Sequence, residues 1–298
     1  MMRYAIFGAI VAATLLSSAC SPSSDDAGAA NEADTAGGAA QTDAASASPD
    51  ALTSSVDGLQ IQATTSLPTN PAGTPQAEFC SGYVRDARSP GAEAIRRAGW
   101  AVTGEAEAGG YQIVSFVGSM EPGTSGTCQL TDGNIALFHD GALKALVYGA
   151  KGGSAIGSIK PANGGLRIMD GDLVSAPVAD VQFADAGAVA IVPVAASDNV
   201  CGGTASVPNI HDMPINAARK KLIAAGWVPA SRDTPVSEME DPRAFDLSRQ
   251  GLPEVDSCSG TGMGYCSFAY NGTAGHLSVT TVGDAEWPAV SHYGVDCD

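Results

Sequence analysis

The stretches AIRRAGW (residues 94–100) and KLIAAGW (residues 221–227) share one layout, and this layout decides the expected fold. Each is typical of the end of a short amphipathic helix, because glycine readily takes the left-handed conformation that closes a helix. A tryptophan follows each glycine and is expected to begin a strand. In the second copy Ile215, Ala218, Leu222 and Ala225 recur at helical spacing, so these side chains are expected to face a sheet.

Strand-like apolar runs follow both helices, and two turn signals lie among them. His139-Asp140-Gly141 and Asn271-Gly272 are each flanked by such runs, which is the pattern of a β-hairpin. The expected strands cover residues 111–117, 135–138, 143–148, 165–169, 178–183, 188–194, 265–270 and 277–282. The predicted fold class is α+β, with two disulfide-stapled units of helix plus antiparallel sheet after a disordered tether.

The start of the chain has the layout of an export signal. Arg3 supplies one positive charge, and residues 4–16 are uncharged and mostly apolar, which suits a signal-peptide core but not a membrane span. Leu16-Ser17-Ser18-Ala19-Cys20 follows and resembles the bacterial lipobox, with Leu16 one place further from the cysteine than is usual. An ordinary secretory signal with a chance cysteine is the alternative.

The lipobox resemblance implies an address for the protein. Residues 1–19 would be a signal peptide that is removed, and Cys20 would carry a diacylglycerol with acyl chains such as palmitate. Two or three acyl chains hold a protein firmly to a membrane, whereas one anchors it only marginally. Ser21 resembles the residue that directs lipoproteins of diderm bacteria to the outer membrane, so the expected location is the cell envelope.

Residues 20–77 are predicted to be a disordered acidic linker. No aromatic residue occurs between Cys20 and Asp57, and no Lys or Arg occurs between Arg3 and Arg85. Such a segment cannot bury enough apolar surface to offset its ordering entropy. Residues 64–75, rich in Pro and Thr, are expected to be flexible as well. Two domains are expected after the linker: a strand-rich α+β domain at 78–196 and a helix-plus-sheet domain at 197–298.

The net charge of the chain is −17 at pH 7. This charge argues against nucleic acid as a partner, because nucleic-acid binding rests on the neutralisation of phosphates by Lys and Arg. It also argues against adsorption to an anionic lipid surface. The only membrane contact expected is therefore the one through the lipid on Cys20.

Six cysteines remain after Cys20, and an even number in an exported protein indicates disulfides. Fifteen pairings are possible in principle. Proximity along the chain and the boundary near Ala196 favour three pairs: Cys80 with Cys128, Cys258 with Cys266, and Cys201 with Cys297. The close cysteine pairs typical of structural zinc sites do not occur, so neither a metal nor a cofactor is expected.

The second helix-then-sheet stretch also has a family resemblance. Residues 207–213 (VPNIHDM), followed by Ala217, Leu222 and Gly226, resemble the head of a PASTA domain, a small module of cell-wall kinases and penicillin-binding proteins. The resemblance is limited to about residues 207–228, and the long segment 229–256 departs from the family. It implies a similar local fold and slightly favours binding to the cell wall.

Two further features are candidate binding sites. Gly260, Thr261, Gly262, Met263 and Gly264 lie between two cysteines, which predicts a disulfide-closed loop that can carry recognition; a phosphate loop is the alternative. Arg85, Arg88, Arg96 and Arg97 form the densest basic patch, which indicates either a solvated helix face or a docking surface for a carboxylate or an acidic partner.

Catalytic and calcium-binding signatures are absent from the sequence. The four histidines form no H-x-x-x-H pattern, and no G-x-S-x-G elbow occurs. Asp170-Gly171-Asp172, with Asp132 and Asp180, favours a turn with exposed carboxylates over a calcium loop. No catalytic residue is therefore predicted.

Three functions follow from these observations. The first is a lipid-anchored binding or interaction module for a protein or cell-wall (peptidoglycan) partner. The second is an envelope hydrolase whose active site lies in the 78–196 domain, which would require a pocket that gathers Asp132, His139 or Asp172. The third is a structural accessory of the outer membrane, whose deletion would cause an envelope defect. The missing catalytic motifs favour the first.

Overall fold

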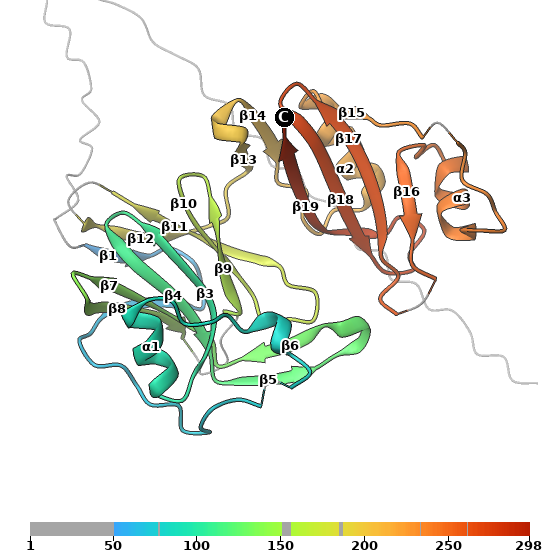
Figure 1. Cartoon of the computed structure of the whole chain (residues 1–298). Coiled ribbons are helices and arrows are strands. Elements are labelled where there is room, and N and C mark those ends of the chain that lie inside the picture. Colours follow the sequence, from blue (N-terminus) through green and yellow to red (C-terminus); the bar gives the residue numbers. More distant parts are fainter. Residues whose placement is uncertain (1–50, 77, 151–155, 185–186, 233, 261) are drawn as a thin grey trace, which may run out of the picture. The chain divides into compact units, whose positions relative to one another are not determined.

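The computed structural model describes residues 51–298 except 77, 151–155, 185–186, 233 and 261 (Figure 1). The expected signal peptide, Cys20 and most of the predicted linker lie outside the described residues. Among the helices that the structure describes, none has the length and apolar character needed to cross a membrane.

Two five-stranded sheets form the first part of the described chain. One sheet has the order β1 (Leu52–Ser54), β12 (Val189–Val192), β11 (Pro177–Phe183), β10 (Gly165–Met169), β9 (Ser158–Ala162). The other has the order β2 (Leu59–Ala63), β8 (Ala142–Gly149), β7 (Asn134–His139), β4 (Tyr111–Val117), β3 (Ala101–Ala108). Apolar side chains of both sheets share one buried cluster, in which Ile113 and Leu137 of the second sheet meet Ile168 and Ile191 of the first.

Helix α1 (Pro90–Arg97) packs on the second sheet through a separate apolar cluster (Figure 1). Ser89 caps the helix, because its hydroxyl accepts a hydrogen bond from the Ala92 backbone N–H at 3.1 Å. Gly99 follows the last turn with a φ of +89°, and Trp100 lies directly before β3. The predicted helix end at a left-handed glycine is thus confirmed.

A two-stranded hairpin of β5 (Ser119–Pro122) and β6 (Cys128–Thr131) extends from the same part of the chain. The short 3-10 helix η1 (Ser81–Tyr83) packs next to it, and a second one, η2 (Thr124–Gly126), joins its two strands. The disulfide Cys80–Cys128 ties the segment before α1 to this hairpin.

The second part of the chain folds around a further sheet, β15 (Val228–Pro229), β17 (Cys266–Gly272), β18 (Gly275–Val282), β19 (Ala289–Cys297), with β16 (Val255–Cys258) paired to β17. Helices α2 (Ile215–Ala224) and α3 (Pro242–Arg249) contribute Leu222 and Leu247 to its core. The hairpin β13 (Ser197–Val200) and β14 (Ala205–Pro208), joined by the 3-10 turn η4 (Cys201–Gly203), precedes α2. No sheet among the described residues contains strands from both sides of residue 196.

The mixed α+β class and the disulfides are confirmed. The bonds join Cys80 to Cys128, Cys201 to Cys297 and Cys258 to Cys266, which are the three predicted pairs. The predicted strands are all present, with bounds that shift by a few residues.

The structure corrects the prediction that the linker runs to residue 77. Strands β1 and β2 lie within it: β1 pairs with β12, and Leu59 of β2 is buried in the sandwich core. Residues 64–75 are also anchored, because the buried Asn70 amide donates to the carbonyls of Gly99 and Gly118, both at 3.0 Å. This part of the chain is ordered with few apolar side chains of its own, because the neighbouring strands supply its hydrogen-bond partners and the apolar surface on which it packs.

Three further expectations were wrong in detail. The pairing of β1 with β12 is parallel, whereas antiparallel sheets were expected throughout. Ala225 is exposed at the end of α2, although Ile215, Ala218 and Leu222 are buried as predicted. Asn271 and Gly272 belong to β17, and the turn falls two residues later, because Gly272 still pairs with Gly275.

Candidate functional site

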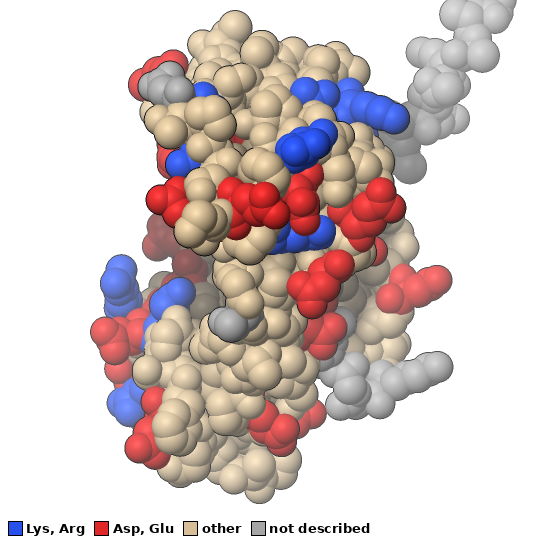
Figure 2. Space-filling model, turned by 90° about the vertical axis from the view of Figure 1, so that its right-hand side faces the viewer, with Lys and Arg blue, Asp and Glu red and all other residues tan. Residues whose placement is uncertain are grey.

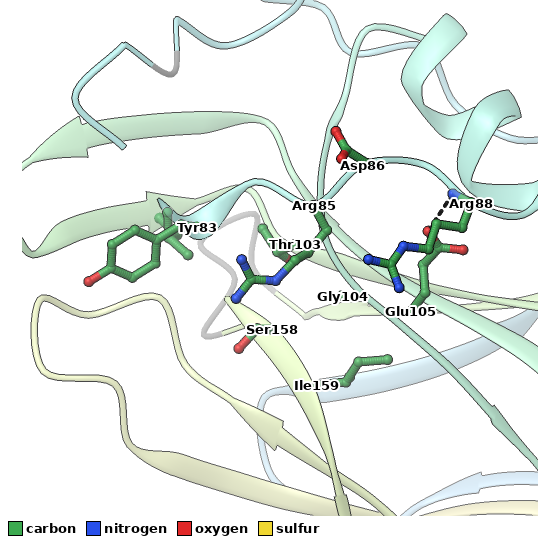
Figure 3. Close-up of a pocket in the computed structure, with 10 residues that line it drawn as sticks. Tyr83, Arg85, Asp86, Arg88, Thr103, Gly104, Glu105, Ser158 and Ile159 are labelled. Atoms are coloured by element: carbon green, nitrogen blue, oxygen red, sulfur yellow. Dashed lines mark hydrogen bonds between the residues drawn. The ribbon is translucent and has the colours of Figure 1, made fainter. Parts of the chain in front are cut away.

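A pocket of about 430 Å³ lies beside the segment that leads into α1 (Figure 3). We call it the arginine pocket, because Arg85 and Arg88 line it together with Tyr83, Thr103, Glu105 and Ser158. Its walls come from three places in the sequence: the segment 83–88, strand β3 and the start of β9.

The segment that carries the two arginines is held at both ends. The Cys80–Cys128 disulfide anchors its start, and the Ser89 cap of α1 fixes its end. Between them the backbone follows β3, because Arg85 N–H donates to the Val102 carbonyl at 2.8 Å and Arg88 N–H donates to the Glu105 carboxylate at 2.8 Å. Both guanidinium groups are therefore carried by a fixed backbone.

Neither guanidinium has a carboxylate partner within 4 Å among the described residues. Arg85 donates one hydrogen bond, from Nη1 to the Gly82 carbonyl at 2.9 Å, and Arg88 has no side-chain partner in the described part of the chain. The nearest acid, Glu105, already accepts from the Arg88 backbone. Figure 3 shows the two arginine side chains reaching across the pocket, whereas Asp86 points away. Most of the guanidinium donors therefore remain available to a ligand.

The floor of the pocket is closed by small residues on β3. Gly104 lies at an irregularity of the β3–β4 pairing, where an added Cβ would come within 2.9 Å of Ser115 Oγ and 3.2 Å of Ile159. The buried Thr103 hydroxyl donates to Ser115 Oγ at 3.0 Å. The glycine thus lets β9 approach β3, and the approach brings Ser158 to the arginines.

The arrangement suits the binding of a planar oxyanion. Guanidinium groups present donors in a rigid fork that matches the two oxygens of a carboxylate, and such charge-assisted pairs are among the stronger hydrogen bonds. Tyr83 and Ser158 add hydroxyl groups to the lining. Figure 2 shows both acidic and basic side chains on one face of the molecule, whose chain has a net charge of −17.

The loop predicted as a binding tip lies elsewhere. Gly260 and Gly264 line a pocket of about 380 Å³ with Asp241, Asp246 and Asp284, and Thr261 is outside the described residues. Met263 is held in place: its carbonyl accepts from Gly283 N–H at 2.9 Å, and its sulfur accepts from the Thr124 hydroxyl at 3.3 Å. The acidic lining does not fit the phosphate-loop alternative.

The carboxylates and the histidine named for the hydrolase and calcium alternatives are not gathered. Asp132 lines a pocket with Trp100 and Asn134, His139 Nδ1 bonds to the Gly110 carbonyl at 2.9 Å, and Asp172 accepts from Gln129 at 3.0 Å. Asp170 accepts from the backbone of Ala176 and Asp172, as in a tight turn, and burial raises the pKa of its carboxyl. Within the described part of the chain no three metal-ligating side chains form a cluster.

The sequence indicates only the two arginines of the arginine pocket and not the rest of its lining. All four arginines of the predicted basic patch are exposed, but only Arg85 and Arg88 line the pocket. Arg96 and Arg97 lie on α1, where Arg96 pairs with Glu93 at 3.0 Å. The contributions of Tyr83, Thr103 and Ser158 carried no sequence signal, because β9 reaches the pocket only through tertiary packing.

Comparison with known proteins gives no family to build on. No protein-family model, curated protein or solved structure matches this chain. The residues 207–228 that resemble a PASTA head form β14, α2 and β15. The arginine pocket is therefore the feature from which a function can be inferred.

Proposed function

We propose that this protein is a binding module of the bacterial cell envelope, anchored by lipid on Cys20, which takes a carboxylate of its partner into the arginine pocket. The partner is a protein or the peptidoglycan of the cell wall, and the membrane is the outer membrane. Residues 20–50 form the acidic tether in this proposal. One disulfide, Cys80–Cys128, closes the part before residue 196, and two, Cys201–Cys297 and Cys258–Cys266, close the part after it.

One observation supports the proposal above all others. Arg85 and Arg88 lie at one pocket without a carboxylate partner in the described structure, on a segment fixed by a disulfide and a helix cap. A rigid backbone lowers the entropic cost of binding, because fewer bonds are frozen when the ligand arrives.

The carboxylate is the chemical group that both expected partners share. The stem peptides of peptidoglycan end in carboxylates, and so does every protein chain. The net charge of −17 would repel an anionic partner at long range, so binding is expected to be selective rather than fast. The tether would keep the pocket within reach of a partner near the membrane.

The test is cross-linking in living cells with the full-length lipoprotein. A photoreactive aromatic residue replaces Tyr83, which lines the pocket and is partly exposed. We expect an adduct with a protein or with peptidoglycan, which mass spectrometry and digestion of the wall would distinguish. The adduct should be lost in the Arg85→Gln/Arg88→Gln variant, since the amides cannot form the charged pair.

Two controls accompany this experiment. Arg96→Gln/Arg97→Gln removes the same charge from exposed positions on α1 and should keep the adduct. Cys20→Ser should remove the anchor and show which adducts require the membrane. An adduct that survives Arg85→Gln/Arg88→Gln, or that disappears equally in the α1 control, would rule out the arginine pocket as the binding site.

A further inference from the structure

A second pocket, of about 270 Å³, lies where β9 and β10 meet β13 and β19. We call it the lysine pocket. Lys160, Arg167, Asp198, His292 and Tyr293 supply its polar lining. Its remaining wall is largely apolar, with Pro161, Val200, Val207 and Val295 among the lining residues.

Two carboxylates at or near this pocket, Asp198 and Asp180, already form ion pairs with Arg167. Arg167, only 2% exposed, forms a bidentate pair with Asp180 at 2.7 and 3.0 Å. It forms a second bidentate pair with Asp198, both bonds at 2.7 Å. Asp198 also accepts from Asn163 at 3.1 Å and from the Tyr293 hydroxyl at 3.3 Å. The single positive charge of Arg167 thus balances part of the negative charge on the two carboxylates, and each carboxylate oxygen accepts at least one hydrogen bond.

Lys160 is left without an acceptor. It lies opposite Arg167 in the β9–β10 pairing, so both side chains project from the same face of the sheet. Neither an ion pair nor a hydrogen bond of its ammonium group occurs within the described residues. Burial, and then the charge of Arg167, lower the pKa of Lys160, and the charges of Asp198 and Asp180 partly offset them. A negative group in direct contact with the ammonium would stabilise its charge further.

Two histidine rings near Lys160 also have nitrogens without a hydrogen-bond partner among the described residues. His292 lines the pocket, and no hydrogen bond of its ring occurs in the described part of the structure. His211 does not line the pocket, but its buried Nε2 has no hydrogen-bond partner among the described residues. The two rings and Lys160 are near enough for their charges to interact: burial first, then these charges, lower the pKa of His292, and burial and Lys160 lower that of His211.

We propose that the lysine pocket is a second ligand site, which binds a small organic carboxylate with its charged end at Lys160 and its apolar end against the valines. Lys160 and His292, whose side-chain nitrogens have no acceptors among the described residues, define the charged end of such a ligand, and the apolar wall defines the other end. The volume suits a molecule smaller than a typical drug. The site shares no residue with the arginine pocket.

Binding should depend on pH. The groups that face the pocket or its histidines are Lys160 on β9, Arg167 on β10, Asp180 on β11, Asp198 on β13, His211 and Asp212 before α2, and His292 and Tyr293 on β19. A bound carboxylate would favour the protonated imidazoles, so protons would be taken up on binding. Affinity should therefore rise as pH falls from about 8 to about 6.

The experiment measures benzoate binding to the full-length lipoprotein in detergent, by calorimetry and by NMR of the histidine ring protons. We expect saturable binding that perturbs His292 and strengthens at lower pH. Sulfate, which has charge but no apolar end, should bind more weakly. Lys160→Met should weaken benzoate binding about tenfold or more, whereas Lys144→Met, at an exposed position on β8, should not change it.

A stability measurement separates a ligand site from a structural role. Lys160→Met should change the melting temperature of the ligand-free protein only slightly, because the Lys160 ammonium makes no hydrogen bond or ion pair within 4 Å among the described residues. Arg85→Gln/Arg88→Gln should leave benzoate binding intact. Absence of saturable binding in the wild type, or equal benzoate affinity in Lys160→Met, would overturn the proposal.

Discussion

At the scale of single residues, the buried carboxylate of Glu254 carries a charge that its neighbours in the second part of the chain must compensate. Glu254 is 1% exposed, and its Oε1 accepts from Arg219 Nε at 2.7 Å and from the Tyr270 hydroxyl at 3.0 Å. Burial, and then the charge of Glu254, raise the pKa of Tyr270. The other oxygen, Oε2, has no partner among the described residues, so the ion pair with Arg219 carries most of the compensation.

Removal of Arg219 should therefore be costly. Arg219→Met leaves a buried carboxylate without its cation, and we expect a loss of about 3 kcal/mol in the free energy of unfolding, measured with urea. The double variant Arg219→Met/Glu254→Leu should recover much of this loss, because no charge is then buried.

The exposed pair of Arg96 and Glu93 provides the control for this prediction. Arg96→Met should cost less than about 1 kcal/mol, since surface ion pairs contribute little. If Arg219→Met were as mild as Arg96→Met, the ion pair with Arg219 would not be what stabilises the buried Glu254 carboxylate.

At the scale of elements, the two helix ends that share the sequence pattern also share their geometry. Gly99 follows α1 with a φ of +89°, and Gly226 follows α2 with a φ of +92°. A Cβ at Gly226 would meet no atom within 4 Å, and one at Gly99 would make only ordinary contacts. Backbone conformation alone therefore explains glycine at both positions.

Substitution of either glycine should lower the free energy of unfolding by a similar amount. Gly99→Ala and Gly226→Ala should each lower the free energy of unfolding by about 1–2 kcal/mol, because an L-residue is strained in the left-handed region. Gly82→Ala is the matched control: it has open space and no positive φ, so urea unfolding should show no loss. A cost at Gly226 no larger than at Gly82 would contradict the cap assignment.

At the scale of the whole molecule, the lysine pocket links strands on both sides of residue 196, and two histidines, His292 in its lining and His211 nearby, make this region sensitive to acid. Burial and neighbouring charge lower the folded-state pKa values of His211 and His292 below 6.5. The unfolded chain then binds more protons than the folded chain at mildly acidic pH. Stability from these two histidines is complete above about pH 7 and is lost as pH falls below 6.5.

Urea unfolding between about pH 7.5 and about pH 5 tests this linkage. The free energy of unfolding should fall with pH, and the fall should be smaller in His211→Gln/His292→Gln. His276→Gln is the control, at an exposed position on β18, and should keep the wild-type slope. Identical slopes in wild type and double variant would show that acid acts through other groups.

Local patterns determined much of this protein from the sequence alone. The two glycine-closed helices, the hairpin at Asp140-Gly141 and the cores of the strands follow from conformational preferences that neighbouring residues impose. The three disulfides follow from proximity along the chain and from the boundary near Ala196, which none of them crosses. The lipid anchor at Cys20 remains a prediction of the same local kind.

Tertiary packing alone decided the rest. Residues 52–63 look like linker, yet they form strands, since the sheets supply the burial and hydrogen bonds that the segment cannot make by itself. Ser158 joins Arg85, and Asp198 joins Arg167, only when strands distant in sequence pack together. A sequence pattern reports a residue's near neighbours, whereas a pocket depends on which distant backbones approach, and that is set by the balance of burial over the whole fold.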